Sequence, residues 1–479
     1  MLFNSFDFLV FFTIVYILFF ASKGVFRQLV LLISSCVFYA WFIPKYLLIL
    51  FVTIAIDYYA AIKIENADSE KSKRLALILG IVNTCAVLFI FKYQNFFLDN
   101  LNWITQSSFA HWDIILPIGL SFHTFQSLSY VIDVYRKKIP AERNLLTYSN
   151  YVMMFPQLVA GPIERAGHLI PQIKSTLYNR LSQSDFSIGM TIFFYGLFKK
   201  MVVGDNIAPY VSAVYDNYTY HSGATLLVAT MLFAIQIYAD FSGYSDMAIG
   251  IARILGYRFN DNFQTPYFSK SVTEFWRRWH ISLSSWLRDY LYYPLVLGWG
   301  KISKFKLNAS ILVTFALIGL WHGANWTFVI FGTLHGIYLV VENITEGMRK
   351  WFVNFIRLTR LPRIHHAIQM TIVFVLVSLS FIFFRATSLT QALDILKKIF
   401  SNFSIREINF LDTNGFATLS FSILVLFLCE YLIFTKYSIE DIYNMRLGKW
   451  FAPLIAIGSI LLVFSFGWWG GASFIYFQF

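Results

Sequence analysis

Long apolar runs separated by short polar stretches follow one another along nearly the whole chain. An apolar run of about 20 residues is long enough to cross a bilayer as a helix. The runs lie at about residues 2–21, 25–43, 46–62, 75–93, 114–135, 186–203, 224–248, 367–384, 416–435 and 451–467. This pattern predicts an all-α, polytopic membrane protein of about 11–13 helices, folded as one domain over residues 1–479.

Two apolar regions do not fit a single straight helix. Residues 144–185 contain three prolines, and broken backbone at membrane depth is tolerated only inside protein or along a cavity, so we expect a re-entrant segment. Residues 307–341 carry no formal charge over 35 positions. One helix of that length would measure about 52 Å, against a bilayer core of about 30 Å. We therefore expect a broken helical hairpin that is interrupted near residues 322–325.

The segment 254–306 has a different pattern, with apolar and charged residues on opposite faces of a predicted helix. Ser271 and Glu274 match a capping box, which predicts a helix start. The apolar face comprises Trp276, Trp279, His280, Leu283, Leu287 and Leu291, and the polar face comprises Arg277, Arg278, Ser285, Arg288 and Asp289. The pattern predicts one amphipathic helix that ends near Pro294 and lies at the cytoplasmic interface or between spans.

Composition and charge support a membrane protein. The chain is 57% hydrophobic and 13% charged, with a net charge of +12. Because the basic residues lie between apolar runs, they indicate cytoplasmic loops rather than a nucleic-acid surface. Loops 63–74, 136–143 and 347–366 are expected inside, and 94–113 and 204–223 outside. The N-terminal run lacks a preceding basic stretch, which favours a retained first span over a signal peptide.

No metal site is expected. Cys36, Cys85 and Cys429 are isolated within apolar segments, which fits neither a disulfide framework nor a zinc site. The chain has no HExxH motif, no G-x-S-x-G nucleophile elbow and no phosphate-binding loop. A transferase of this sequence would therefore depend on an isolated histidine base.

Several histidines lie within apolar segments. His322 would sit at the helix interruption deep in the membrane, where an ionisable group is a functional candidate by default, although a hydrogen bond to an exposed carbonyl is the structural alternative. Asn325 is the nearest residue that could orient it. His335 fits an interhelical hydrogen bond as well as catalysis. His280 fits a structural role as well as substrate contact, and His123 fits packing or a tunnel wall.

Two aspartates also fall in or near a span. Asp240 and Asp246 belong to the stretch YADFSGYSDMAIG. They could bind a cation in a transporter, or tie helices together in an enzyme, and the residues alone do not separate these classes. A non-catalytic membrane scaffold is a third possible class.

Five stretches together carry a family resemblance: PQLVAGPIER (156–165), YADFSGYSDMAIG (238–250), NFQTPYFSKSVTEFWRRWHISLSSWLRDYLYYPL (262–295), GLWHGANWTFVIFGTLHG (319–336) and WWGGASFIYFQF (468–479). The chain resembles the membrane-bound O-acyltransferase (MBOAT) family, in particular its bacterial polysaccharide-acetylating branch. The resemblance implies a ring of helices around a thinned centre with a tunnel. It also implies that His322 in the WHG motif and His280 in the RRWH segment are catalytic. We expect Trp321, Asn325, His123, Asp240 and Asp246 to be supporting or tunnel residues.

The same resemblance implies a reaction. Acetyl-CoA would be the cytoplasmic acyl donor, and no cofactor would be bound. The donor's phosphates could be contacted by Lys270, Arg277, Arg278 and Arg288. The alternative is that these four residues only form the basic, cytoplasm-facing side of a helix. His322 would act as a base or carry the acetyl group briefly. The acetyl group would pass through the bacterial cytoplasmic (inner) membrane to an extracytoplasmic transferase or esterase-like partner and then to peptidoglycan, alginate or another polysaccharide. D-alanyl transfer to teichoic acid and a transporter or flippase are the alternatives.

Overall fold

The computed structural model describes residues 1–479 except 115, 118, 160, 406–412, 471–473 and 476–479. The described residues form helices joined by turns and loops, without a strand. Contacts divide the chain into two compact units. The first unit comprises Met1–Gly196, Tyr244–Asn260 and Leu447–Ala456, and the second comprises Leu197–Gly243, Asp261–Arg446 and Ile457–Phe479.

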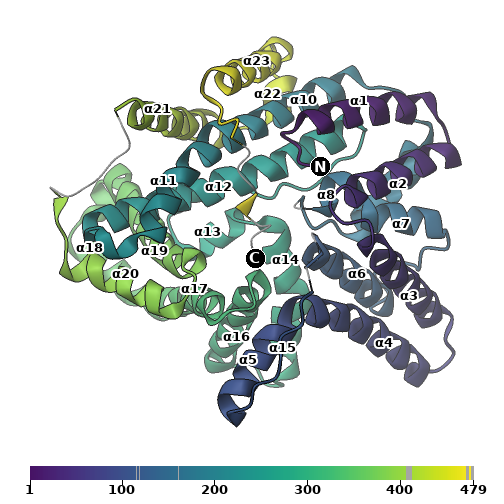
Figure 1. Ribbon diagram of the computed structural model, residues 1–479, viewed down its shortest axis with the longest axis horizontal. Helices are drawn as coiled ribbons and strands as arrows, with labels where there is room; N and C mark the ends of the chain where they lie inside the picture. Colours follow the sequence, from purple (N-terminus) through teal and green to yellow (C-terminus); the bar gives the residue numbers. More distant parts are fainter. Residues whose placement is uncertain (115, 118, 160, 406–412, 471–473, 476–479) are drawn as a thin grey trace. The chain divides into compact units, whose positions relative to one another are not determined.

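The first unit is built from the N-terminal helices, which are purple to blue in Figure 1. They are α1 (Phe6–Ala21), α2 (Val25–Ala40), α3 (Tyr46–Asn66), α4 (Glu70–Leu88), η1 (Phe89–Tyr93), α5 (Gln94–Thr105), α6 (Leu120–Tyr135), α7 (Leu145–Met153), α8 (Phe155–Leu158), α9 (Ala166–Ser175) and most of α10 (Gln183–Phe198). Helices α3, α4 and α6 pack on one another, and α2 packs on α1 and α7. A cluster of buried phenylalanine rings, including Phe3, Phe8, Phe38 and Phe155, joins the N-terminus, α1, α2 and α8.

Residues 144–185 are helical only in short pieces, and most of α7 and all of α8 are buried. The backbone leaves the helical region at Met154, whose ψ is 116°. The neighbouring polar groups are still hydrogen-bonded, since Phe155 N donates to Ser35 Oγ at 3.1 Å and Gln157 Nε2 donates to Tyr151 O at 2.5 Å. Interrupted backbone inside protein is the condition under which such a segment can exist at membrane depth.

The second unit contains the segments that bear His280, His322 and His335. Its elements are η3 (Lys199–Gly204), α11 (Asp205–Asp216), α12 (Gly223–Ile254) as far as Gly243, α13 (Val272–Arg278), α14 (Ile281–Leu287), η6 (Arg288–Tyr292), α15 (Tyr293–Gly298), α16 (Lys304–His322), α17 (Trp326–Ile344), α18 (Glu346–Phe355), α19 (Pro362–Arg385), α20 (Leu389–Ser401), α21 (Thr413–Cys429), η9 (Glu430–Phe434), α22 (Ile439–Asn444) and α23 (Gly448–Phe466) from Ile457. Helices α16 and α17 pack along each other, and α17 also packs on α13 and α19.

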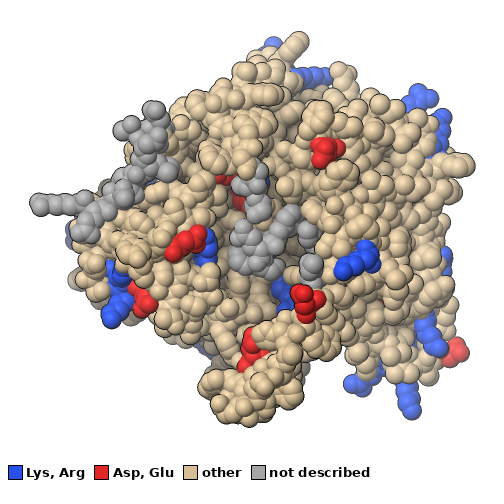
Figure 2. Space-filling model, viewed as in Figure 1, with Lys and Arg blue, Asp and Glu red and all other residues tan. Residues whose placement is uncertain are grey.

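Within the described part of the chain, nine helices are long and apolar enough to span a membrane, and α1 and α2 are shorter apolar helices. Most of the face in Figure 2 is uncharged, with Lys, Arg, Asp and Glu in scattered groups. The chain is therefore a multi-pass membrane protein, and the predicted all-α polytopic class is confirmed. Several boundaries differ from the prediction. Helix α6 begins only at Leu120, and the loops expected at 94–113 and 204–223 contain helices α5 and α11.

The prediction of one amphipathic helix from 271 to about 294 is wrong. The start is as predicted, because Ser271 Oγ accepts from Glu274 N at 3.0 Å. The helix then stops after Arg278, and a new one begins at Ile281. Between them His280 has φ 44° and ψ 55°, the left-handed conformation. Asn262 stabilises this break, since its backbone O accepts from Ile281 N at 2.9 Å.

Candidate active site

The interruption in the uncharged region falls between α16 and α17, at residues 323–325. Helix α17 carries Gly332 and Gly336 in the sequence GTLHG, and α16 carries Gly319 in the sequence GLWHG, whose second glycine, Gly323, is the C-cap. A Cβ built on Gly332 would lie 2.7 Å from Gly319 N, and one on Gly319 would lie 3.1 Å from Gly332 N. Small residues at this spacing let two helix backbones approach closely, which explains how two antiparallel apolar helices form a tight hairpin around the break.

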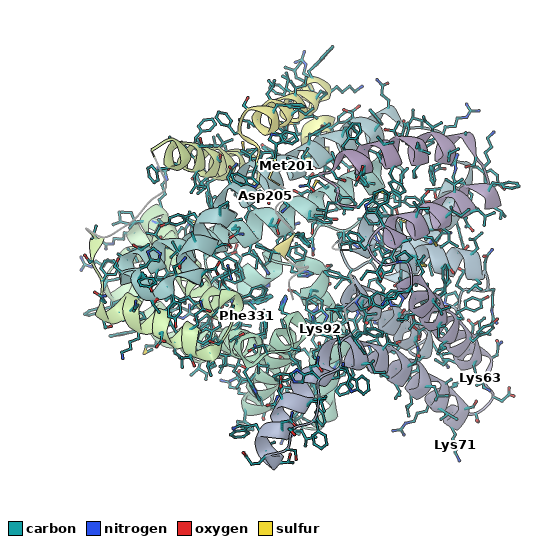
Figure 3. All side chains as sticks on the ribbon, viewed as in Figure 1. Lys63, Lys71, Lys92, Met201, Asp205 and Phe331 are labelled. Carbon is teal, nitrogen blue, oxygen red and sulfur yellow. The ribbon has the colours of Figure 1, made fainter. Side chains whose placement is uncertain are left out.

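His322 is the last residue of α16 and is 5% exposed. Its ring is surrounded by aromatic rings, with centroids of Trp321, Phe384 and Phe331 at 4.9, 5.4 and 6.0 Å. Phe331 is labelled on α17 in Figure 3. The imidazole thus lies at a helix C-terminus, where the partial negative charge of the helix end favours a protonated ring during a reaction.

Asn325 has a clear local role. It is the N-cap of α17, and its side-chain Oδ1 accepts from Thr327 N at 3.0 Å. This bond satisfies one of the N–H groups that a helix start leaves without an intrahelical partner. Asn325 therefore defines where the second arm of the hairpin begins.

His280 is completely buried at the break between α13 and α14. Its Nδ1 lies 3.2 Å from Asn262 Oδ1, and the same oxygen accepts from Ser282 N at 3.3 Å and from Ser282 Oγ at 2.8 Å. Because a backbone N–H can only donate, the Asn262 atom is an oxygen, and His280 Nδ1 must carry the proton. Burial lowers the pKa of His280 to about 3. His280 is therefore a neutral imidazole that is protonated on Nδ1 and unprotonated on Nε2.

Trp321 brings the two predicted catalytic histidines together. Its ring centroid lies 4.9 Å from that of His322 and 6.2 Å from that of His280. The His280 ring also meets Phe241 edge-on at 4.8 Å. Two histidines that are 42 positions apart in the sequence are thus separated by one tryptophan ring in an aromatic environment.

His335, by contrast, has both ring nitrogens engaged. Trp276 Nε1 donates to His335 Nδ1 at 3.3 Å, and His335 Nε2 lies 2.8 Å from Ser380 Oγ. Because an indole N–H only donates, Nδ1 is unprotonated and Nε2 carries the proton. Ser380 Oγ in turn donates to Val377 O at 2.7 Å. This arrangement ties α17 to α13 and α19, and it matches the interhelical alternative for His335.

Asp240 belongs to a buried ionic cluster. Lys200 Nζ lies 2.5 Å from Asp240 Oδ1 and 2.6 Å from Asp205 Oδ1. Ile475 N donates to Asp240 Oδ2 at 2.7 Å. Asp205 is labelled in Figure 3 close to Met201, on the same helical run. The geometry joins α12 to η3 and α11, as expected of a residue that ties helices together.

Two of the predicted supporting residues lie in the first unit. His123 is buried on α6, with its Nε2 3.4 Å from Thr53 Oγ1. Asp246 is half-buried on the part of α12 that belongs to the first unit. Part of the tail motif 468–479, namely residues 471–473 and 476–479, lies outside the described residues.

The basic residues predicted to bind the donor divide into two groups. Arg278 Nη2 donates to Glu274 Oε1 at 2.6 Å on the same helix, so its charge is paired. Lys270, Arg277 and Arg288 are exposed, and Arg288 also contacts Asp289 at 3.0 Å. Over the residues that the structure describes, no group of three His, Cys, Asp or Glu side chains could hold a metal ion.

Sequence reasoning missed the partners that fix these histidines. Asn262 precedes His280 by 18 positions, and Ser380 follows His335 by 45, so no local spacing connects them. It also missed a polar cluster in the first unit. Glu164, whose side chain is fully buried, accepts from Asn260 N at 2.6 Å and lies 2.7 Å from His168 Nδ1.

Fold and site together define a polytopic helical membrane protein with a buried histidine pair at a broken hairpin. Residues 83–386 match the family model for membrane-bound O-acyltransferases. The "Probable alginate O-acetylase AlgI" of Pseudomonas aeruginosa is 38% identical over 453 residues, which cover 93% of this chain and 83% of that protein. The peptidoglycan O-acetyltransferase of Helicobacter pylori is 36% identical over 79% of this chain and 74% of that protein.

A teichoic acid D-alanyltransferase of Bacillus subtilis is 26% identical over half of this chain and 62% of its own length. The chain belongs to the membrane-bound O-acyltransferase family. It is an O-acyltransferase, and the predicted family and enzyme class are confirmed.

Proposed function

We propose that this chain is a membrane O-acetyltransferase of the bacterial cytoplasmic membrane that helps to O-acetylate an extracytoplasmic polysaccharide. The observation that carries the proposal is the His322–Trp321–His280 arrangement. It occurs in a chain whose similarity to an alginate O-acetylase covers 93% of its length. Alginate and peptidoglycan are the two acceptors that the relatives' names support.

His322 is the proposed general base. It takes the proton of an acceptor hydroxyl while the hydroxyl oxygen attacks the carbonyl carbon of an acetyl thioester. The C–O bond forms, the C–S bond breaks, and the proton held by His322 returns to the leaving thiolate. The products are an acetyl ester and a free thiol. The aromatic rings around His322 exclude water, which limits competing hydrolysis of the thioester.

His280 is proposed to assist from the other side of Trp321. The neutral tautomer that Asn262 holds leaves Nε2 as a hydrogen-bond acceptor. We assign His280 an accessory role, because the helix end at His322 stabilises the imidazolium that a base must become.

Acetyl-CoA is the proposed donor, entering from the cytoplasm. Lys270, Arg277 and Arg288 are exposed and would meet its phosphates through charge-assisted contacts. Arg278 is a weaker candidate, since Glu274 already pairs with it. The acetyl group would then reach a separate extracytoplasmic transferase, which completes the ester on the polysaccharide.

The transporter and D-alanyl alternatives have less support. Asp240, the aspartate best placed for a cation, is occupied by Lys200 and by Ile475 N. Similarity to the teichoic acid D-alanyltransferase of Bacillus subtilis covers only 50% of the chain.

The test is acetyl release and transfer by purified protein in proteoliposomes that are supplied with labelled acetyl-CoA. We expect His322→Ala and His322→Gln to lower the rate by at least about a hundredfold while the thermal unfolding midpoint stays close to that of the parent. His111→Ala, a histidine exposed in a loop beside Asp99, is the matched control and should leave the rate unchanged. Normal acetyl transfer by a folded His322→Ala protein would refute the assignment.

A further inference from the structure

Helix α18 exposes an apolar face that none of the described residues covers. Met348, Trp351, Phe352 and Phe355 are between 53% and 69% exposed, and the helix has no buried residue. Their spacing of three and four residues places them on one side of the helix, while Glu346, Lys350 and Asn354 fall on the other. In water, an aromatic face of this size on a ten-residue helix would be unfavourable.

The position of α18 in the chain restricts its surroundings. It connects α17 and α19, both of which are long and apolar enough to span a membrane. A helix between two consecutive spans must remain at one membrane surface. Only residues 345–361 separate α17 from α19, so the chain is too short to carry α18 far from that surface.

The charge of this connection is strongly positive. From residue 345 to 366 it contains five basic residues and one acidic residue, Glu346. Glu346 pairs with Lys350 at 2.6 Å. The remaining basic side chains are exposed: Arg349, Arg357, Arg360 and Arg363.

We propose that α18 is an interfacial helix that inserts its aromatic face into the headgroup region of an anionic phospholipid surface. Apolar side chains on one face with basic residues alongside are the combination that binds such surfaces. Trp351 and Phe355 would lie at the boundary between headgroups and acyl chains, where aromatic rings are favoured. Arg357, Arg360 and Arg363 would contact the phosphates of the anionic lipids.

The first test measures which face of α18 meets lipid. In the full-length protein with Cys36, Cys85 and Cys429 replaced by serine, single cysteines are introduced as W351C, F355C, K350C and N354C and labelled with bimane. The proteins are placed in nanodiscs of phosphatidylcholine and phosphatidylglycerol. We expect a nitroxide-bearing lipid to quench the labels at 351 and 355 at least about threefold more than those at 350 and 354, and aqueous iodide to show the reverse order.

Equal quenching by iodide at all four positions would overturn the proposal, because the helix would then stand in water. Labels at 351 and 355 that are shielded from iodide in native membranes, but not in nanodiscs, would also overturn it, since a protein partner would then cover the face.

The second test measures the preference for anionic lipid. The triple variant R357Q/R360Q/R363Q should retain phosphatidylglycerol at least about tenfold more weakly than the parent when lipids bound to the purified protein are measured. The matched control K63Q/K71Q/R74Q removes the same charge from the end of α3 and the start of α4; Lys63 and Lys71 are labelled in Figure 3. An equal loss in both triple variants, or in neither, would contradict a specific anionic-lipid contact at α18.

Discussion

Replacing Gly332 by alanine tests whether the close approach of α16 and α17 positions His322. The added Cβ would lie 2.7 Å from Gly319 N and 2.8 Å from Gly319 Cα, and nearer still to Phe315 O. All three are backbone or Cα atoms, so no side-chain rotation relieves the clash. Ordinary van der Waals contact begins near 3.4 Å. Relief of the contact with Gly319 N alone requires a separation of about 0.7 Å, and the closer contact with Phe315 O requires more, so the two helices must move apart beside the histidine.

Two consequences follow from this separation. Overpacking of this kind costs about 1–3 kcal/mol of stability. Because a displacement of about 1 Å at a reacting group can cost a hundredfold in rate, we expect acetyl transfer to fall about ten- to a hundredfold. The assay is thermal unfolding in detergent, followed by acetyl transfer in proteoliposomes.

Two further glycines make the experiment a series. Gly336→Ala should be milder than Gly332→Ala, since its Cβ would meet Phe315 Cβ at 3.1 Å and Leu312 Cδ2 at 3.3 Å. Gly458→Ala is the matched control on spanning helix α23, where nothing lies within 4 Å of the added carbon. The reasoning fails if Gly332→Ala unfolds and reacts like Gly458→Ala.

Three other substitutions probe the polar contacts. His335→Ala should cost about 1–3 kcal/mol, because it removes two hydrogen bonds at a completely buried position, and an unchanged thermal midpoint would show that these bonds do not contribute to stability. Lys200→Met leaves two buried carboxylates without their cation and should cost about 3–5 kcal/mol, with partial recovery in Lys200→Met/Asp240→Asn as measured by thermal unfolding. The hydrogen bond to Glu164 raises the pKa of His168 in the folded protein. The contribution of this pair to the free energy of unfolding is therefore complete below the ordinary histidine pKa of 6.5, and it is lost as pH rises through the higher pKa of the folded state. His168→Gln should therefore flatten the fall in thermal midpoint between about pH 6 and pH 8, and an unaltered slope would show that the pair does not contribute.

The helical class and the broken hairpin could be predicted from the sequence for a simple reason. Both depend on the length of the apolar runs and on the absence of charge within them, because the thickness of a bilayer fixes how many apolar residues one helical crossing requires. An uncharged run of 35 residues is too long for one crossing, and the glycine after His322 is the natural place for a break.

The break at His280 could not be predicted in this way. The apolar spacing from Trp276 through Leu283 continues across it without interruption, so periodicity indicates one helix. The deciding interactions come from Asn262, whose backbone and side-chain oxygens take the hydrogen bonds of Ile281 N and Ser282 N. A contact formed across 18 or more positions leaves no periodic signal in the chain.

The roles of His322 and His335 show how much the environment adds to a motif. Both histidines precede the second glycine of a G-x-x-H-G stretch, so the local sequence does not distinguish their roles. On α17 the helix continues past the histidine, and Trp276 and Ser380 occupy its two nitrogens. On α16 the helix ends at the histidine, where the helix dipole favours the charged ring. A base must change its protonation state during the reaction, and the bond from Trp276 to His335 would be lost on protonation. The geometry therefore favours His322 as the base and makes His335 a fixed link between helices.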